Sequence, residues 1–177
     1  MKQFPFHNRK GFTLIETLFA ILIFSAALIS LMTIAGRGIS ATNTSREQIV
    51  AHYLAQEGLE VVRNVRDTNV LNGSAWDAGF SACTEAAPCQ VVYGNPQIAA
   101  PTLVTPCPYS CQVGSVNSAF VDADTANLSP YTRFVYVVPG HTDENGAIDE
   151  YRVVAKASWS SKTIDRSIVL QTILKRW

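Results

Sequence analysis

The stretch Arg9-Lys10-Gly11-Phe12-Thr13-Leu14-Ile15-Glu16 decides which fold this chain adopts. It joins a basic leader to an apolar run of 24 residues, 12–35, in which Glu16 is the one charged residue. At about 1.5 Å per residue, a helix of that length spans a hydrocarbon core of roughly 30 Å. A charge inside such a segment is costly, so we expect Glu16 to have a function.

The cations that precede the run predict how it crosses the membrane. Lys2, Arg9 and Lys10 favour a cytoplasmic N-terminus and place the rest of the chain on the far side of the membrane. A secretory signal has a shorter apolar region and a small-residue cleavage site after it, and no such site is evident at residues 32–40. We therefore predict a single-pass protein of the inner (cytoplasmic) membrane.

Composition argues against two classes of function. The chain has 14 Lys and Arg against 14 Asp and Glu, with no basic run beyond Arg9-Lys10, so no nucleic-acid partner is predicted. Catalysis is not predicted either, because no phosphate loop, metal-ligand helix or nucleophile elbow occurs and neither His52 nor His141 has a partner at motif spacing. We expect a non-enzymatic protein without a cofactor.

All four cysteines lie beyond the membrane run, in a compartment that favours disulfides. Five residues separate the first two and three separate the last two, which favours two local pairs, although a crossed pairing would clip the whole segment together. A zinc site is the alternative, but these spacings are not the usual two-residue knuckles. The disulfide candidates are Cys83, Cys89, Cys107 and Cys111.

Residues 36–71 predict an amphipathic continuation of the helix. Gly36 and Gly38 are expected to loosen the helix, and Thr44 and Glu47 have the spacing of a capping box that would restart it. From residue 50 onward, apolar positions recur at helical intervals and polar residues occupy the opposite face. The apolar set is Leu54, Val61 and Val65 with Tyr53 and Val62 beside them; the polar set is Gln56, Glu60, Arg63 and Asp67.

Residues 72–177 predict a globular domain that ends in an antiparallel sheet. Residues 72–130 show no sustained periodicity, with short apolar pieces at 90–93 and 102–105. Strand-like runs occur at 132–138, 151–159 and 163–174, and their short connections favour a meander. The three tryptophans are expected either to pack in the core or, for one at a sheet edge, to contact another subunit; they are Trp76, Trp159 and Trp177.

The acidic segment 143–150 permits a second interpretation. Asp143, Asn145 and Asp149 offer alternating oxygen ligands that could hold calcium, although their spacing is not that of an EF-hand loop. Asn145-Gly146 is more simply explained as a tight turn between two strands. No other metal site is predicted.

The run from Lys10 to Leu18, with the apolar helix behind it, strongly resembles the type IV pilin family, the class III prepilins of type IV pili and type II secretion systems. The resemblance implies that a prepilin peptidase cuts after Gly11 and N-methylates Phe12. It also implies that Glu16 neutralises the amine of Phe12, in its own chain or in a neighbouring subunit, which avoids an unpaired charge in an apolar fibre.

The resemblance implies an α+β fold in which a long N-terminal helix packs on a small C-terminal antiparallel sheet. The chain then has a leader at 1–11, an apolar helix at 12–35, its continuation at 36–71 and a globular domain at 72–177. Residues 54–64 also look like the helices of minor pilins and of I-type minor pseudopilins. Unlike many major pilins, the apolar segment contains no proline.

The function expected from this resemblance is structural. The leading hypothesis is a minor pilin of a type IV pilus or pilus-like filament; the alternatives are a type II secretion minor pseudopilin and a singly anchored extracytoplasmic binding protein. The partners implied are the prepilin peptidase, other pilin or pseudopilin subunits through the N-terminal helix, and the inner membrane before assembly.

Overall fold

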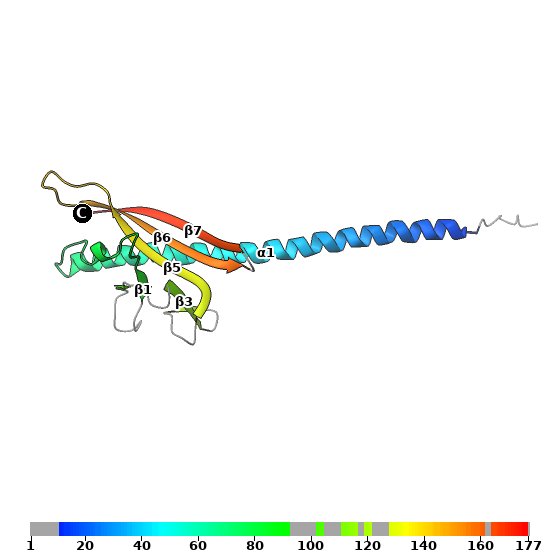
Figure 1. Ribbon diagram of the computed structural model, residues 1–177, viewed down its shortest axis with the longest axis horizontal. Coiled ribbons are helices and arrows are strands. Elements are labelled where there is room, and N and C mark those ends of the chain that lie inside the picture. Colours follow the sequence, from blue (N-terminus) through cyan, green and yellow to red (C-terminus); the bar gives the residue numbers. More distant parts are fainter. Residues whose placement is uncertain are drawn as a thin grey trace, which may run out of the picture. The chain divides into compact units, whose positions relative to one another are not determined.

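The computed structural model describes residues 11–92, 102–104, 111–116, 119–121, 128–161 and 164–176. The chain divides into two compact units, Met1–Ser45 and Arg46–Trp177, called here the N-terminal and C-terminal units. One helix, α1, contributes to both. In Figure 1 the elements are α1 (Leu14–Leu71), the 3-10 helix η1 (Phe80–Ala82), β1 (Gln90–Val92), β2 (Thr102–Val104), β3 (Gln112–Val116), β4 (Ala119–Val121), β5 (Leu128–Pro139), β6 (Glu150–Ser161) and β7 (Ile164–Lys175).

Helix α1 begins at Leu14, two residues later than the sequence predicted, because Thr13 acts as its N-cap. The backbone N–H of Glu16 donates to Thr13 Oγ1 at 3.3 Å, which satisfies one of the N–H groups that a helix leaves unpaired at its start. Glu16 therefore lies in the first turn, where a negative charge is favourable next to the positive end of the helix dipole.

The sequence predicted a loosened helix at Gly36 and Gly38 and a restart at Thr44, and the structure shows no break that would need a restart. α1 continues through these positions without interruption, for 58 residues in all. Hydroxyl side chains along it donate to backbone carbonyls of the preceding turn, as Ser25 does to Ile21 and Thr33 to Ile29. Such internal bonds let small polar residues stay in an apolar helix without needing water.

The C-terminus of α1 is closed by a glycine in the left-handed conformation. Gly73 has φ +69°, its N–H donates to the carbonyl of Val70, and the N–H of Ser74 donates to that of Asn69. This is the Schellman pattern, which pairs carbonyls that a helix end otherwise leaves free. Helix α1 thus ends at a signal that is local in the sequence.

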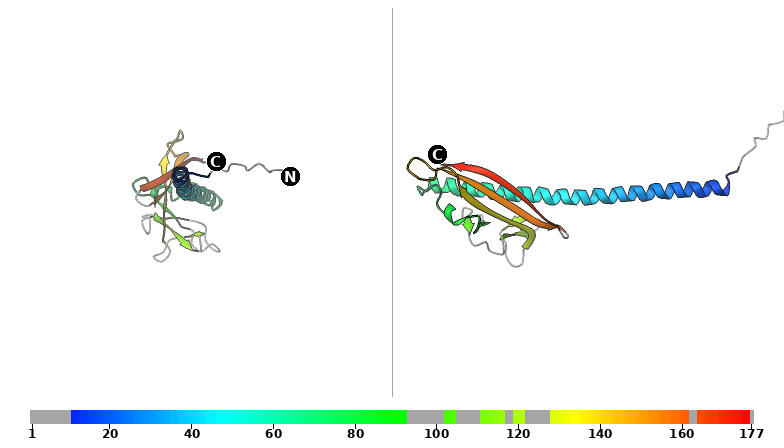
Figure 2. Two further views of the ribbon diagram at one scale, coloured as in Figure 1. Left: turned by 90° about the vertical axis from the view of Figure 1, so that its right-hand side faces the viewer. Right: turned by 45° about the horizontal axis from the view of Figure 1, so that its top comes forward.

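The C-terminal unit contains a five-stranded antiparallel sheet in the order β4-β3-β5-β6-β7, and β1 pairs separately with β2. The predicted α+β fold is confirmed, and so are the three long strands as neighbours in a meander. Figure 1 and the right-hand view of Figure 2 show β5, β6 and β7 running alongside the part of α1 that belongs to this unit. The short strands β1 to β4 fall in the segment where no strand periodicity was evident.

The core of the C-terminal unit lies between α1 and the inner face of the sheet. Along β5 the burial alternates with the period of two of a strand, and Arg133, Val135 and Val137 face inward. The helix presents small residues to them, and a Cβ placed on Gly58 would stand 3.0 Å from Val135 Cγ1. Helix and sheet are therefore close at this point. The buried residues of α1 are Ala51, Leu54, Ala55, Gly58, Leu59, Val61, Val62 and Arg66.

One residue assigned to the apolar face of this helix lies outside the core. Tyr53 is 66% exposed, while Ala51 and Ala55 are buried instead. The large side chain suggested a core position, but the helix comes so close to the sheet that this face accepts alanine and glycine. Of the tryptophans, Trp76 and Trp159 are buried; Trp177 lies outside the described residues.

Candidate processing and assembly site

The proposed cleavage position lies outside regular structure. Residues 11–13 precede α1 and are non-helical, and a Cβ built on Gly11 would meet nothing within 4 Å. Phe12 is 79% exposed. A protease that binds extended backbone can therefore reach the bond between Gly11 and Phe12 without first unwinding the helix. A substitution at Gly11 also has no neighbour inside the described part of the chain to disturb.

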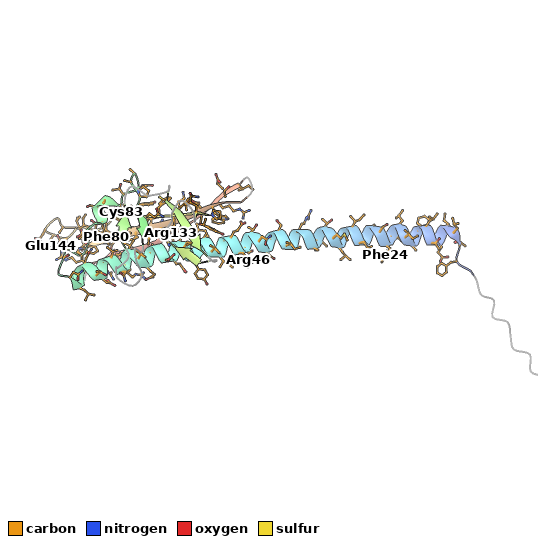
Figure 3. All side chains as sticks on the ribbon, turned by 90° about the horizontal axis from the view of Figure 1, so that it is seen from below. Phe24, Arg46, Phe80, Cys83, Arg133 and Glu144 are labelled. Atoms are coloured by element: carbon orange, nitrogen blue, oxygen red, sulfur yellow. A yellow bond between two sulfur atoms is a disulfide. The ribbon has the colours of Figure 1, made fainter. Side chains whose placement is uncertain are left out.

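The apolar residues of the N-terminal unit pack against nothing in the described part of that unit. The described large apolar side chains from Phe12 to Ile39 are between 43% and 79% exposed. By length and composition α1 qualifies as a membrane-spanning helix, and none of its most apolar window is buried. Figure 3 shows side chains projecting from both edges of the helix around Phe24. A helix that is apolar all round needs lipid or other helices as its environment.

The structure places Glu16 on the surface of this apolar helix, one turn from Phe12. Its side chain is exposed. Among the described residues it forms no ion pair, and its backbone N–H is the atom that bonds Thr13. Its carboxylate is therefore available to a cation from outside the helix. Thr13 and Glu16 have capping-box spacing, which is the local sequence signal for a helix that begins at Leu14.

The cysteines form a second set of predicted residues. Cys83 and Cys89 are joined by a disulfide with Cα atoms 5.1 Å apart, and both are buried. Backbone hydrogen bonds of 2.8 Å join Cys89 to Val135 and Cys83 to Val137. The disulfide therefore closes a loop, and these backbone hydrogen bonds hold the loop beside Val135 and Val137 of β5. Cys111 is also disulfide-bonded, and Cys107 lies outside the described residues.

The residues weighed as calcium ligands lie in the loop between β5 and β6, where local partners engage them. Asp143 Oδ1 accepts the backbone N–H groups of Asn145 and Ala147, each at 2.9 Å, and Gly146 follows with φ +79°. Asp149 Oδ1 lies 2.7 Å from His141 Nδ1. These contacts are those of a tight turn. In the described part of the chain, no three His, Cys, Asp or Glu side chains are grouped as a metal site would require.

The ionisable side chains of the core include two tyrosines and an ion pair. Burial raises the pKa of Tyr151 above its ordinary 10.0, and the charge of Asp77 and the hydrogen bond to it raise the pKa further. Burial raises the pKa of Tyr131 as well, with a smaller contribution from Glu47. Arg133 is buried on β5 and pairs with Glu57 of α1. No local sequence pattern indicates this pair, because its members are 76 residues apart.

Comparison with known proteins gives one match. Residues 6–32 match the family model of the prokaryotic N-terminal methylation motif. This segment begins in the basic leader, includes Gly11, Phe12 and Glu16, and extends into the apolar part of α1. No curated protein and no solved structure matches the chain.

Proposed function

We propose, from the class III prepilin signal that residues 6–32 carry, that this chain is a structural subunit of a type IV pilus or pilus-like filament and serves there as a minor pilin. The methylation motif is the observation that carries this proposal. It supports a prepilin of the type IV pilin-like kind, processed by a prepilin peptidase and assembled with other pilins.

The first step of the proposed function is processing at the cytoplasmic face of the membrane. The peptidase cuts after Gly11, which releases the leader and leaves a new amine on Phe12 that is then methylated. The position of the bond before the first turn of α1 supports this step, since the backbone there is not tied into helical hydrogen bonds. Gly11 adds no side chain to hinder entry into a protease cleft.

The second step is assembly through the apolar helix. In lipid, the exposed apolar side chains of α1 are solvated by acyl chains; in a filament, the helices of other subunits take that place. The amine on Phe12 would be an unpaired charge in such a core, and Glu16 supplies the opposite charge. Pairing of Glu16 with the amine, within one chain or between neighbouring subunits, avoids the cost of that unpaired charge. Pairing between subunits also fixes how far one helix is shifted along the filament axis relative to the next.

The finer assignment rests on the helix of the C-terminal unit. Residues 54–64 resemble the corresponding part of minor pilins, which favours a minor pilin, and also that of I-type minor pseudopilins. A type II secretion pseudopilin is therefore the second candidate. The genes that flank this one distinguish the two, because a pilus and a secretion system each need their own assembly proteins.

The processing step is tested by replacing Gly11 with valine in the full-length chain. We expect a membrane-bound precursor that keeps the leader, seen by mass spectrometry as an uncut N-terminus. Gly38→Val is the matched control, because a Cβ at Gly38 also meets nothing within 4 Å, and it should be processed normally. Normal cleavage of the Gly11 variant would contradict the prepilin assignment.

The assembly step is tested by Glu16→Ala. We expect cleavage and methylation to proceed while incorporation into sheared filaments falls strongly, because the amine of Phe12 loses its partner. Thr17→Ala, one position along the helix, should assemble like the wild type. If Glu16→Ala enters filaments as efficiently as wild type, the role given to Glu16 is wrong. If neither the wild type nor the variant is found in filaments, the chain is better described as a singly anchored protein that does not polymerise.

A further inference from the structure

The chain contains two Asn-Gly pairs, Asn72-Gly73 and Asn145-Gly146. In such a pair the backbone nitrogen of glycine can attack the side-chain Cγ of asparagine, because glycine has no Cβ to hinder the approach. A new C–N bond forms at Cγ, the side-chain nitrogen leaves as ammonia with the proton of the glycine N–H, and a cyclic succinimide results. Water then opens the ring to an aspartyl or isoaspartyl residue. This deamidation needs only water, so the local structure sets its rate.

The second pair lies at the exposed tip of the loop between β5 and β6. Asn145 and Gly146 are both exposed. The side-chain amide of Asn145 forms no hydrogen bond in the described part of the chain, so its Cγ is open to water and to the neighbouring backbone. Glu144, the residue before it, marks this loop in Figure 3.

Asp143 holds the nitrogen that makes the attack. The backbone N–H of Gly146 donates to the Asp143 carbonyl at 2.9 Å. The Asp143 carboxylate accepts the N–H groups of Asn145 and Ala147, one on each side of Gly146, also at 2.9 Å. A nitrogen whose proton is engaged in this way is a poor nucleophile. The peptide between Asn145 and Gly146 is therefore held away from the reaction until the turn opens.

The first pair is held in a different way. The N–H of Asn72 donates to the Thr68 carbonyl and that of Gly73 to the Val70 carbonyl, each at 3.0 Å. These are main-chain bonds of the last turn of α1, and both residues of the pair are exposed. The same dipeptide thus occurs twice on the surface. At Asn72 the backbone of a helix restrains it, whereas at Asn145 the restraint includes one side chain, that of Asp143.

We propose that Asn145 is a deamidation site and that Asp143 sets the rate of the reaction. The closed turn blocks the attack, and each opening of the turn frees the glycine nitrogen. The product adds a carboxylate to a loop that already carries Glu144 and Asp149, and like charges repel. An isoaspartyl product also adds a methylene to the main chain. The modified turn is therefore less stable than the original, and the change is one-way.

The site is tested by incubating the full-length chain in detergent micelles in mildly alkaline buffer and mapping its peptides by tandem mass spectrometry. We expect Asp143→Ala to accelerate deamidation at Asn145 about tenfold, because two hydrogen bonds that close the turn are lost. Asn72 is the reference in the same molecule, and its rate should not change. An unchanged rate at Asn145 would overturn the proposal.

Two further variants separate the hydrogen bonds of the turn from its charge. Asp143→Asn keeps an oxygen acceptor without the charge, and the rate at Asn145 should stay within about twofold of wild type. Glu144→Ala removes an exposed charge beside Asn145 but no bond to the turn amides in the described part of the chain, and it too should have little effect. If either variant accelerates the reaction as much as Asp143→Ala, charge controls the rate and the proposal is wrong.

The denatured chain supplies the rate without any turn. In chemical denaturant, Asn145 of the wild type should react at least about tenfold faster than in the folded protein. Equal rates in the folded and the denatured chain would show that the turn gives no protection, against the proposal. None of these measurements depends on cleavage at Gly11 or on filaments, so the proposed function and this modification site stand or fall separately.

Discussion

Gly58 shows at the scale of one residue how closely the helix approaches the sheet. An added Cβ would lie 3.0 Å from Val135 Cγ1 and 3.4 Å from Ala155 Cβ. The sequence contains a signal for this, since a glycine inside a helical pattern costs about 1 kcal/mol relative to alanine and so implies a packing reason. The signal does not reveal which strand is the neighbour.

We predict that Gly58→Leu destabilises the C-terminal unit by about 2 kcal/mol, because the larger side chain must push helix and sheet apart. Thermal unfolding of the full chain in detergent, followed by near-ultraviolet circular dichroism, measures the change. Gln56→Leu, on an exposed position of the same helix, is the control and should leave stability nearly unchanged. Equal stability of the two variants would show that the core tolerates a wider spacing.

Tyr151 makes the stability of the folded protein depend on pH in the alkaline range. Its phenol donates to Asp77 Oδ2 at 3.3 Å, and burial, followed by the charge of Asp77, raises its pKa in the folded state. The unfolded state therefore releases its proton first, as the pH passes about 10. The contribution of the neutral phenol to stability is complete below that pH and is lost as the pH rises through the folded-state pKa.

We predict that Tyr151→Phe makes the alkaline loss of stability less steep above about pH 10. Unfolding temperatures of wild type and variant across the alkaline range provide the measurement. Tyr53→Phe is the control, since Tyr53 is 66% exposed. Tyr131 retains its own raised pKa, so the dependence should be weakened and not abolished. If Tyr151→Phe leaves the slope of unfolding temperature against pH unchanged, groups other than Tyr151 cause the alkaline loss of stability.

At the scale of elements, the continuity of α1 is the main departure from expectation. Two glycines in three positions weaken a helix locally by about 1 kcal/mol each, but α1 continues through both of them. Gly36 and Gly38 have open space around them, so no packing reason within the described residues explains their presence. They lower the local stability of the helix without interrupting it.

We predict that Gly36→Ala with Gly38→Ala stabilises this part of α1 by about 1 kcal/mol per site. Amide hydrogen exchange of the full chain in detergent micelles should slow over residues 34–42. Ala41→Gly is the matched reverse change and should accelerate exchange in the same segment. Unchanged exchange in the alanine variant would mean that the amides open through a wider unfolding of the helix.

At the scale of the whole molecule, the disulfide between Cys83 and Cys89 lies in the segment that joins α1 to β1, which has little secondary structure of its own. Cys83 and Cys89 close a loop whose sequence separation is 6, and the loop bonds through its backbone to Val135 and Val137. The backbone of this loop therefore pairs with β5 at Val135 and Val137, beyond the residues of β5 that pair with β3.

We predict that the double variant Cys83→Ala, Cys89→Ala lowers the free energy of unfolding by about 2 kcal/mol, as loop-closure entropy implies for so short a loop. Chemical denaturation of the full chain under oxidising conditions measures it. Ser81→Ala, exposed and just before the loop, is the control. A variant as stable as the wild type would show that the backbone bonds to β5 hold the loop without the covalent link.

The sequence by itself determined the features that depend on local pattern. The basic leader, Gly11 and the apolar run predicted a prepilin signal, which the methylation motif at residues 6–32 confirms. The strand-like run at residues 132–138 predicted β5, whose side chains alternate between the two faces of the sheet whatever the strand packs against.

Only the tertiary structure decided the features that depend on which side chains of α1 and of the sheet face each other across the core. The exposure of Tyr53, the burial of Gly58 and the pairing of Arg133 with Glu57 follow from the separation of α1 and β5, which no local pattern encodes. Local periodicity sets which face of an element is apolar; the distance between elements sets which side chains fit there.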